Sequence, residues 1–392
     1  MSYLLSARQF LKKLAWYPPA ETKIALGSVF SAIVSSKGNF KWTLCNYLQV
    51  KHCVLGNSGR ALLYILLDAL KREDGDLRNE VLIPGYTCYS VAASVAKAGL
   101  KIAIYDLDPR TFAPDMDSVK ANSSENTLAI ISQHLFGIPT PIDELRQITE
   151  GVRAYIIEDA AQALGGTLNG RSLGTMGDFG FFSFGRGKPL PLGGGGALIG
   201  KDADVLSGLD LKPGNKGYVS LMTTAVSQVM SKPSLYWIPE MLPLGLGETI
   251  FDPNFDVSAM PFVIQNLAEN SMEVLDELNT HRRHIAKTYK EAFDDECVIP
   301  IPEGGSAVYT RFPLMAGPGP IPKELKRLGV RRMYPKAIAD EETIKPYIAN
   351  HQAQTPGTFE ILRKLITLPT HLGINKGLAA DIAHKVKKTF LR

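Results

Sequence analysis

The sequence lacks the features that mark membrane-spanning and secreted proteins. No window of its 392 residues approaches the roughly 18 consecutive apolar residues of a membrane helix. The first 15 residues mix apolar side chains with Arg8, Lys12 and Lys13, so the uninterrupted apolar core of a signal peptide is missing. The four cysteines form no CxxC pair and no metal-ligand spacing with histidine. We therefore expect a protein of the cytoplasm, where thiols stay reduced, with no metal site and no membrane association.

A strong charge pattern is also missing. The formal net charge of +4 is small, and the lysines and arginines are scattered rather than gathered in a basic stripe. This distribution argues against nucleic acid as a partner. The content of 45% hydrophobic and 21% charged residues is that of an ordinary globular protein, and the length favours two domains.

Between residues 50 and 200, short apolar runs alternate with helical patterns. We expect strands at 81–84, 101–105, 128–132, 154–157, 179–184 and 197–200, and helices at 58–70, 89–98 and 141–150. Strands that alternate with helices predict an α/β fold with a mostly parallel sheet covered on both faces.

The second half of the chain has a different pattern. Residues 219–230 carry no charge and are followed by a proline-punctuated stretch, which predicts a helix and then an irregular apolar segment. That segment, 215–250, suits a subunit interface better than a membrane-facing patch. A long helix is expected over 260–293. We expect a large α/β domain at 1–250 and a smaller α+β domain at 251–392.

Two sequence features could form an anion site and a strand-end site. Ser58, Gly59 and Arg60 open a helix, whose free N–H groups bind phosphate well, although small residues there more often only cap the helix. Asp159 ends the apolar strand that begins at Ile156. Ligands in open α/β sheets lie at the carboxyl ends of strands, so Asp159 either points into a site or caps the next turn.

Lys188 stands between glycines and prolines directly after the apolar run Phe181–Phe184. The ordinary interpretation is an exposed loop lysine. The apolar strand favours a cleft instead, where a desolvated amine becomes a usable nucleophile. The following glycines, 193–196, permit tight backbone packing around a bulky ligand.

Together these motifs resemble the DegT/StrS-type sugar aminotransferases, which are fold-type I pyridoxal-phosphate enzymes. The resemblance is carried by Asp159-Ala-Ala-Gln162, by Ser183-Phe-x-x-x-Lys188 and by the Gly-Gly pair that follows. Pro-x-Tyr-Thr at 84–87 and Gln-His-Leu-Phe-Gly at 133–137 agree with it. The resemblance runs from about Cys53 to His371 and thus covers most of the chain.

The resemblance implies a role for each motif residue. Lys188 would hold pyridoxal 5′-phosphate as a Schiff base and shuttle the proton, and Asp159 would face the pyridine nitrogen. Gln162 would bond the ring hydroxyl oxygen. Ser183 would bind the phosphate together with Ser58, Gly59 and Arg60. Asn254 matches a motif that reaches the phosphate of the neighbouring subunit, which implies a homodimer with composite active sites.

Three departures from the family pattern suggest a divergent branch. Cys88 stands where an aromatic residue usually stacks on the cofactor, so either Cys88 packs on the ring or Tyr86 or Tyr89 replaces it. Asp256 replaces an arginine next to Asn254, and Gly194 replaces an acidic residue before the Gly-Gly pair.

The resemblance implies transfer of an amino group, from glutamate, to a keto group of a nucleotide-linked sugar in polysaccharide or glycoconjugate biosynthesis. Lysine at position 188 is the discriminating residue, because family members that act as dehydratases carry histidine there. Tyr334 and Arg186 are candidate substrate contacts, and His134 and His371 are expected to be structural. Other pyridoxal-phosphate chemistry, such as elimination, and a non-catalytic regulatory or assembly protein remain the alternatives.

Overall fold

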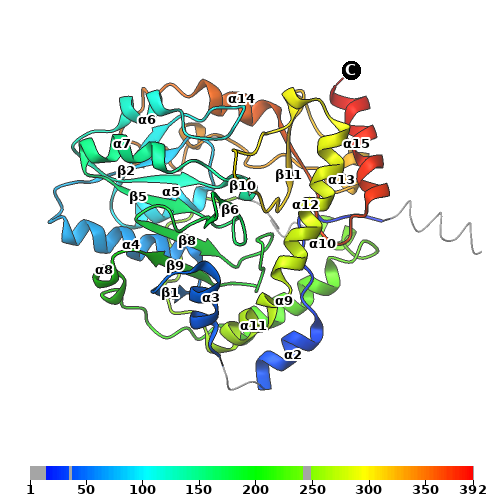
Figure 1. The fold of residues 1–392 in the computed structure, drawn as a ribbon, viewed down its shortest axis with the longest axis horizontal. Coiled ribbons are helices and arrows are strands. Elements are labelled where there is room, and N and C mark those ends of the chain that lie inside the picture. Colours follow the sequence, from blue (N-terminus) through cyan, green and yellow to red (C-terminus); the bar gives the residue numbers. More distant parts are fainter. Residues whose placement is uncertain (1–14, 35–37, 242–248, 392) are drawn as a thin grey trace, which may run out of the picture.

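The centre of the molecule is a seven-stranded sheet with the strand order β1-β9-β8-β5-β4-β2-β3 (Figure 1). The computed structural model describes residues 15–34, 38–241 and 249–391. The sheet consists of β1 (Cys53–Gly56), β2 (Glu80–Pro84), β3 (Lys101–Tyr105), β4 (Thr127–Gln133), β5 (Tyr155–Asp159), β8 (Phe179–Ser183) and β9 (Gly196–Gly200). Within this sheet, β3, β2, β4, β5 and β8 run parallel to one another. At the other edge, β9 pairs antiparallel with β8, and β1 pairs antiparallel with β9. The predicted, mostly parallel α/β sheet is confirmed.

The strands are apolar throughout because both faces of the sheet are buried. In β2, Leu82 belongs to one hydrophobic cluster, while Val81 and Ile83 belong to another. Ile156 and Ile157 of β5 divide between the same two clusters. Successive side chains point to opposite faces of a strand, so each face of the sheet packs against its own layer.

Helices cover the sheet and connect its strands. They are α2 (Leu26–Val34), α3 (Phe40–Leu48), α4 (Gly59–Glu73), α5 (Tyr89–Lys97), α6 (Met116–Asn122), α7 (Asp143–Val152), α8 (Ala203–Ser207), α9 (Gly217–Met230) and α10 (Trp237–Met241). The helix α10 lies in the stretch predicted to be irregular, so that prediction was wrong for these residues. Residues 242–248 and the amino-terminal residues 1–14, assessed above for a signal peptide, lie outside the described residues.

The long helix predicted over 260–293 is in fact two helices, α11 (Phe262–Met272) and α12 (Leu275–Ala292). Val274 separates them with a φ of −102° and a ψ of −1°. The two helices pack against different parts of the molecule, because α11 contacts α2, α3 and α9 whereas α12 packs against α15. An uninterrupted helix could not serve both sets of partners.

The carboxy-terminal part has a small antiparallel sheet of its own, formed by β11 (Phe312–Met315) and β12 (Leu365–Leu368). It also contains α13 (Lys323–Arg327), α14 (Pro356–Lys364) and α15 (Lys376–Phe390). A third sheet joins β10 (Gly305–Ser306) to β6 (Thr167–Leu168) and β7 (Arg171–Ser172).

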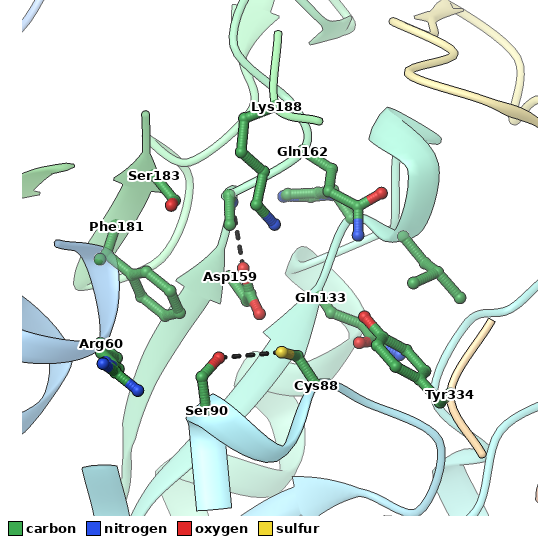
Figure 2. A pocket seen from close by; sticks show the side chains of 14 residues that line it. Arg60, Cys88, Ser90, Gln133, Asp159, Gln162, Phe181, Ser183, Lys188 and Tyr334 are labelled. Carbon is green, nitrogen blue, oxygen red and sulfur yellow. Dashed lines mark hydrogen bonds between the residues drawn. The ribbon is translucent and has the colours of Figure 1, made fainter. Parts of the chain in front are cut away.

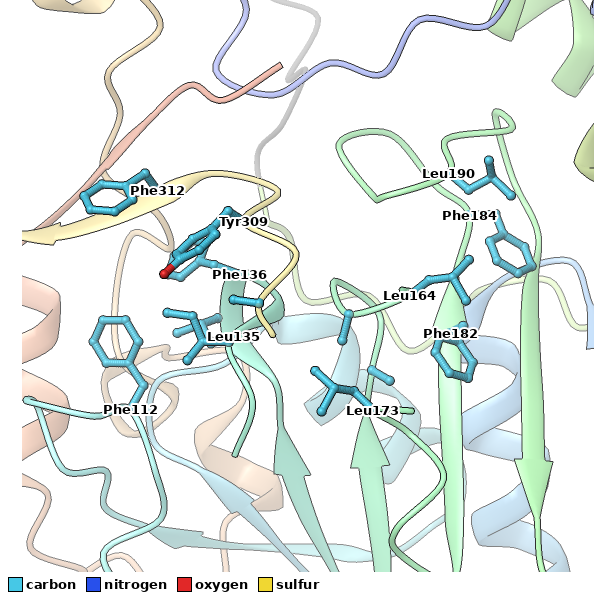
Figure 3. Close-up of a cluster of buried hydrophobic side chains, with 14 of the residues drawn as sticks. Phe112, Leu135, Phe136, Leu164, Leu173, Phe182, Phe184, Leu190, Tyr309 and Phe312 are labelled. Atoms are coloured by element: carbon cyan, nitrogen blue, oxygen red, sulfur yellow. The ribbon is translucent and has the colours of Figure 1, made fainter. Parts of the chain in front are cut away.

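Several contacts join this carboxy-terminal part to the rest of the molecule, and two of them illustrate how it is held. Phe112 and Phe136 share a hydrophobic cluster with Tyr309 and Phe312 (Figure 3). The Asp106 carboxylate, just after β3, accepts hydrogen bonds of 2.7 Å from the backbone N–H groups of the first turn of α14. A carboxylate at a helix N-terminus is stabilising, so the junction is well defined.

The helix α9 leaves an apolar surface exposed. Tyr218, Val219, Met222 and Val226 are each more than half exposed. Val219, Met222 and Val226 border a groove of about 570 Å³ that Arg186 and Tyr236 also line. Within the described residues, none of the helices combines the length and the apolar character needed to cross a membrane.

Candidate active site

A pocket lies where β4, β5 and β8 end, beside the first turn of α4 (Figure 2). The sequence-predicted residues that line it are Gly59, Arg60, Cys88, Asp159, Gln162, Ser183, Lys188 and Tyr334. They come from segments as far apart as α4 and the stretch before α14. The fold thus brings together most of the residues that the motifs singled out, at the carboxyl ends of parallel strands, where α/β sheets bind ligands.

Asp159 is the last residue of β5 and lies deep in this pocket. Its Oδ1 accepts a hydrogen bond of 3.0 Å from the backbone N–H of Ala161, while its other oxygen has no donor among the described residues (Figure 2). Burial raises the pKa of the Asp159 carboxyl, although Lys188, the Ala161 N–H and His134 each act to lower it. The site therefore lacks a positive charge close enough to compensate this carboxylate fully.

Lys188 follows the tight turn that ends β8. Its backbone N–H bonds the Gly185 carbonyl at 3.3 Å, and Gly187 adopts a φ of +74°, a conformation that favours glycine. The Lys188 side chain extends into the pocket toward Asp159 (Figure 2). Its amine forms no ion pair or hydrogen bond with any side chain or backbone group that the structure describes. The amine is thus available to a ligand.

Two hydrogen bonds fix the orientation of Gln162. Its Oε1 accepts from the Phe136 backbone N–H and from the Thr310 hydroxyl, both at 3.2 Å. An amide whose oxygen is occupied in this way presents its Nε2 donor to the pocket. Gln162 can therefore donate a hydrogen bond to an oxygen of a bound molecule.

The first turn of α4 is closely packed against the sheet. Ser58 caps the helix, with its Oγ accepting from the Ala61 N–H at 3.2 Å. The absence of a side chain at Gly196 permits this close packing. A Cβ at position 196 would lie only 2.6 Å from the backbone nitrogen of Gly59. The glycine tract thus packs the end of the sheet against the helix start, and the N–H groups of this turn and Ser183 border the pocket as an anion site.

The tyrosines considered for ring stacking lie elsewhere. Tyr86 donates its hydroxyl to the Met333 carbonyl at 2.5 Å, and Tyr89 donates to the Lys336 carbonyl at 3.1 Å. Neither is among the residues that line the pocket, whereas Cys88 is, with its sulfur 2.9 Å from the Ser90 hydroxyl. Of the two alternatives for ring stacking, the pocket lining favours Cys88 over either tyrosine.

A buried pair next to Asp159 holds the strand end in place. Glu158 accepts three backbone hydrogen bonds, from Gly174, Met176 and Gly177, and contacts His134 Nε2 at 2.7 Å. The other ring nitrogen, Nδ1, accepts from the Thr140 N–H at 3.0 Å, so the proton of a neutral ring lies on Nε2. His134 thus stabilises the strand end rather than presenting a free nitrogen to a ligand.

Three predicted site residues do not line the pocket. Ser58 lies just behind it as the helix cap. Asn254 is exposed, and the ring of the following Phe255 packs 4.8 Å from the guanidinium of Arg60. Arg186 lies in the neighbouring groove, with Nη2 3.5 Å from the Tyr236 hydroxyl.

The analysis of the sequence missed Gln133, Ser90 and Phe181, which also line the pocket. Gln133 ends β4 just as Asp159 ends β5, so the same strand-end rule could have found it. Its amide donates to the Tyr86 carbonyl at 2.7 Å. Within the residues that the structure describes, no group of three or more histidine, cysteine or acidic side chains could hold a metal ion.

Comparison with solved structures identifies the fold. The fold is that of the fold-type I pyridoxal-phosphate enzymes. Among solved structures, PseC from Helicobacter pylori, an aminotransferase involved in the biosynthesis of pseudoaminic acid, superposes with a TM-score of 0.73 at 18% identity. The match covers 96% of this chain and 99% of PseC.

The chain is also similar in sequence to a particular family. Residues 24–209 match the model of the DegT/DnrJ/EryC1/StrS aminotransferase family. A GDP-perosamine synthase of Caulobacter vibrioides is 31% identical over 210 residues, 53% of this chain and 52% of the relative. An L-glutamine:2-deoxy-scyllo-inosose aminotransferase of Micromonospora echinospora is 35% identical over 179 residues, 46% of this chain and 42% of the relative. The chain spans about half the length of the curated relatives that it matches.

Proposed function

We propose that this protein is a pyridoxal-phosphate-dependent aminotransferase that moves an amino group from glutamate to a keto group of a nucleotide-linked sugar. The observation that carries the proposal is the free amine of Lys188, which points toward the buried carboxylate of Asp159 across a pocket at the strand ends. A loop lysine with no such role would extend into solvent.

The residues present fit pyridoxal phosphate. Lys188 is placed to hold the cofactor covalently through its amine, and Asp159 to keep a proton on the ring nitrogen, which would supply the charge that this carboxylate lacks. Gln162 Nε2 can donate to the ring hydroxyl oxygen. Ser183 and the first turn of α4 can bind the phosphate. When bound, the cofactor supplies an electron sink for the bonds at the amino-bearing carbon.

In this proposal, Lys188 also moves the proton. Its amine, which has no partner among the described residues, would act as the general base and general acid for the proton that the reaction moves. Tyr334 closes the same pocket from the carboxy-terminal part of the chain and is proposed to contact the substrate.

The nature of the acceptor is inferred from the relatives. One relative is named a GDP-perosamine synthase and another an L-glutamine:2-deoxy-scyllo-inosose aminotransferase, and from these names we infer amino transfer to a keto group of a sugar-like ring. We propose a nucleotide-linked keto sugar that serves polysaccharide or glycoconjugate biosynthesis in the cytoplasm.

The proposed assembly is a homodimer. Asn254 is exposed on the loop next to Arg60, in a position from which it could reach the phosphate of a neighbouring subunit. The exposed apolar face of α9 supports a second surface of contact between subunits. The division into a large part at 1–250 and a smaller part at 251–392 belongs to the same proposal.

An absorption spectrum tests this function directly. Protein purified with pyridoxal phosphate should absorb near ~400 nm, and added glutamate should shift the band as the cofactor changes to its pyridoxamine form. The variant K188A, which keeps the rest of the pocket, is the control and should not show the band. A wild-type protein that stays colourless would contradict the proposal and favour a non-catalytic function, whereas a band that glutamate leaves unchanged would favour other pyridoxal-phosphate chemistry.

A further inference from the structure

Arg311 is a half-buried cation without a partner among the described residues. It lies between Thr310, which bonds Gln162, and the first residue of β11. Its guanidinium forms no hydrogen bond or ion pair with any group that the structure describes. Burial lowers the pKa of Arg311 to about 10. Because a guanidinium has five N–H donors, leaving all of them unpaired in a partly buried position costs stability.

Among the described residues, no carboxylate acts on Arg311. The groups that act on it electrostatically are three tyrosines, Tyr86, Tyr236 and Tyr334, and a second cation, Arg331. Of these, Tyr334 lines the pocket of Lys188 and Asp159. Arg311 therefore lies one side chain away from the proposed catalytic pocket.

The neighbouring charges leave an excess of positive charge. Arg331 is paired with Glu240 at 2.9 Å. Arg186 approaches the hydroxyl of Tyr236 from the other side, at 3.5 Å, and has no carboxylate partner among the described residues. Among the described residues, only Arg331 of these three arginines forms an ion pair with a carboxylate, so Arg311 and Arg186 keep unpaired positive charges near Tyr236.

We propose that Arg311 binds an anionic group of a substrate, a carboxylate or a phosphate, with Arg186 as a second positive charge at the same subsite. The inference rests on the proposed function, since it places the substrate in the pocket of Lys188. Arginine suits this task because its planar guanidinium can bond two oxygens of one anion at once. The anion is either the carboxylate of the amino donor or the phosphate of the nucleotide-linked acceptor.

The test compares three cofactor-loaded proteins: wild type, R311M and R363M. Methionine keeps much of the length of arginine without its charge, and Arg363 is an exposed arginine of α14 that provides the matched control. Binding of glutarate and of UDP is measured separately by calorimetry. Loading with pyridoxal phosphate fills the phosphate site at α4, and the absorption band confirms loading before each titration.

We expect R311M to weaken binding of at least one probe by roughly 10- to 100-fold, while R363M changes both by less than about twofold. A loss confined to glutarate identifies the donor carboxylate as the anion, and a loss confined to UDP identifies the acceptor phosphate. Unchanged binding of both probes in R311M, or no binding of either probe to wild type, overturns the inference. Neither result affects the cofactor band, so failure of the inference is distinct from failure of the proposed function.

The melting temperature of the variants distinguishes a binding role of Arg311 from a structural role. R311M should melt at or above the temperature of wild type when no anion is present, since it removes an unpaired buried charge. If R311M fails to fold, R311K retains the charge but loses the two-pronged geometry, and weaker binding of a probe by R311K still supports the inference. An R311K protein that binds both probes like wild type overturns it.

Discussion

Asp159 is half-buried at the end of β5 and carries an incompletely compensated negative charge. Its carboxyl has a raised pKa because burial disfavours the ionised form. The cofactor-free folded protein therefore binds the Asp159 proton more tightly than the unfolded chain does. As pH rises from the ordinary carboxyl pKa of about 3.9 through the raised value, this residue makes folding progressively less favourable.

The variant D159N tests whether the charge of Asp159 lowers the stability of the cofactor-free protein at neutral pH. It keeps the shape of the side chain but removes the charge, so at pH 7 the cofactor-free variant should be more stable than wild type by roughly 1 kcal/mol, or about 2 °C in melting temperature. The difference should vanish below about pH 4. Cofactor-loaded D159N should lose activity despite its stability. Equal melting temperatures of the two cofactor-free proteins at pH 7 would show that the buried charge carries no cost.

Substitution of Lys188 is expected to reduce activity while leaving the stability of the fold nearly unchanged. Because its amine has no partner among the described residues, K188A should unfold within about 0.5 kcal/mol of wild type. Its rate of amino transfer should fall by roughly 10²- to 10⁴-fold or more, since the proton carrier is lost. Denaturant unfolding and an assay with glutamate measure the two effects. A large loss of stability would indicate a structural lysine instead.

Among the secondary-structure elements, β8 requires a glycine at position 180 in order to pack as observed. A Cβ at Gly180 would overlap the carbonyl oxygen of Gly174, and this backbone atom could shift only at a substantial energetic cost. We expect G180A to lower the free energy of unfolding by about 1–3 kcal/mol and to weaken cofactor binding through the displaced Ser183. G151A is the control, because Gly151 lies in α7 with open space around its Cα, so alanine there should be neutral or stabilising by about 0.5–1 kcal/mol.

The elements of the large sheet could be predicted because their apolar runs are local. Val81–Pro84 and Ala154–Ile157 are bounded by turns, and both faces of their strands are buried. The break at Val274 could not be predicted, because the apolar pattern continues across it and only the different partners of α11 and α12 separate the two helices.

The same contrast between local sequence signals and long-range contacts applies to the residues of the site. Asp159, Gln162 and Lys188 stand in short motifs, so the sequence was sufficient to select them. Arg311 was not predicted, because its significance depends on Tyr236 and Tyr334, which approach it from other segments of the chain. Long-range proximity of this kind leaves no periodic or motif signal in a single sequence.

For the whole molecule, the proposed composite active site gives a test by mixing subunits. If Asn254 completes the site of its partner, K188A and N254A subunits should complement one another when they are mixed and reassociated. Half of the dimers would be mixed and each would contain one intact site, so about a quarter of wild-type activity should return. Each variant alone should remain nearly inactive. No recovery in dimers shown to be mixed would contradict a shared site.

The most direct test of the account asks which lysine carries the cofactor. Cofactor-loaded protein is treated with borohydride, which makes the link to the amine permanent, and is then digested and sequenced by mass spectrometry. The account predicts the pyridoxyl group on the peptide of Lys188 and on no other. A label on a different lysine, or a loaded protein with no labelled peptide, would contradict it.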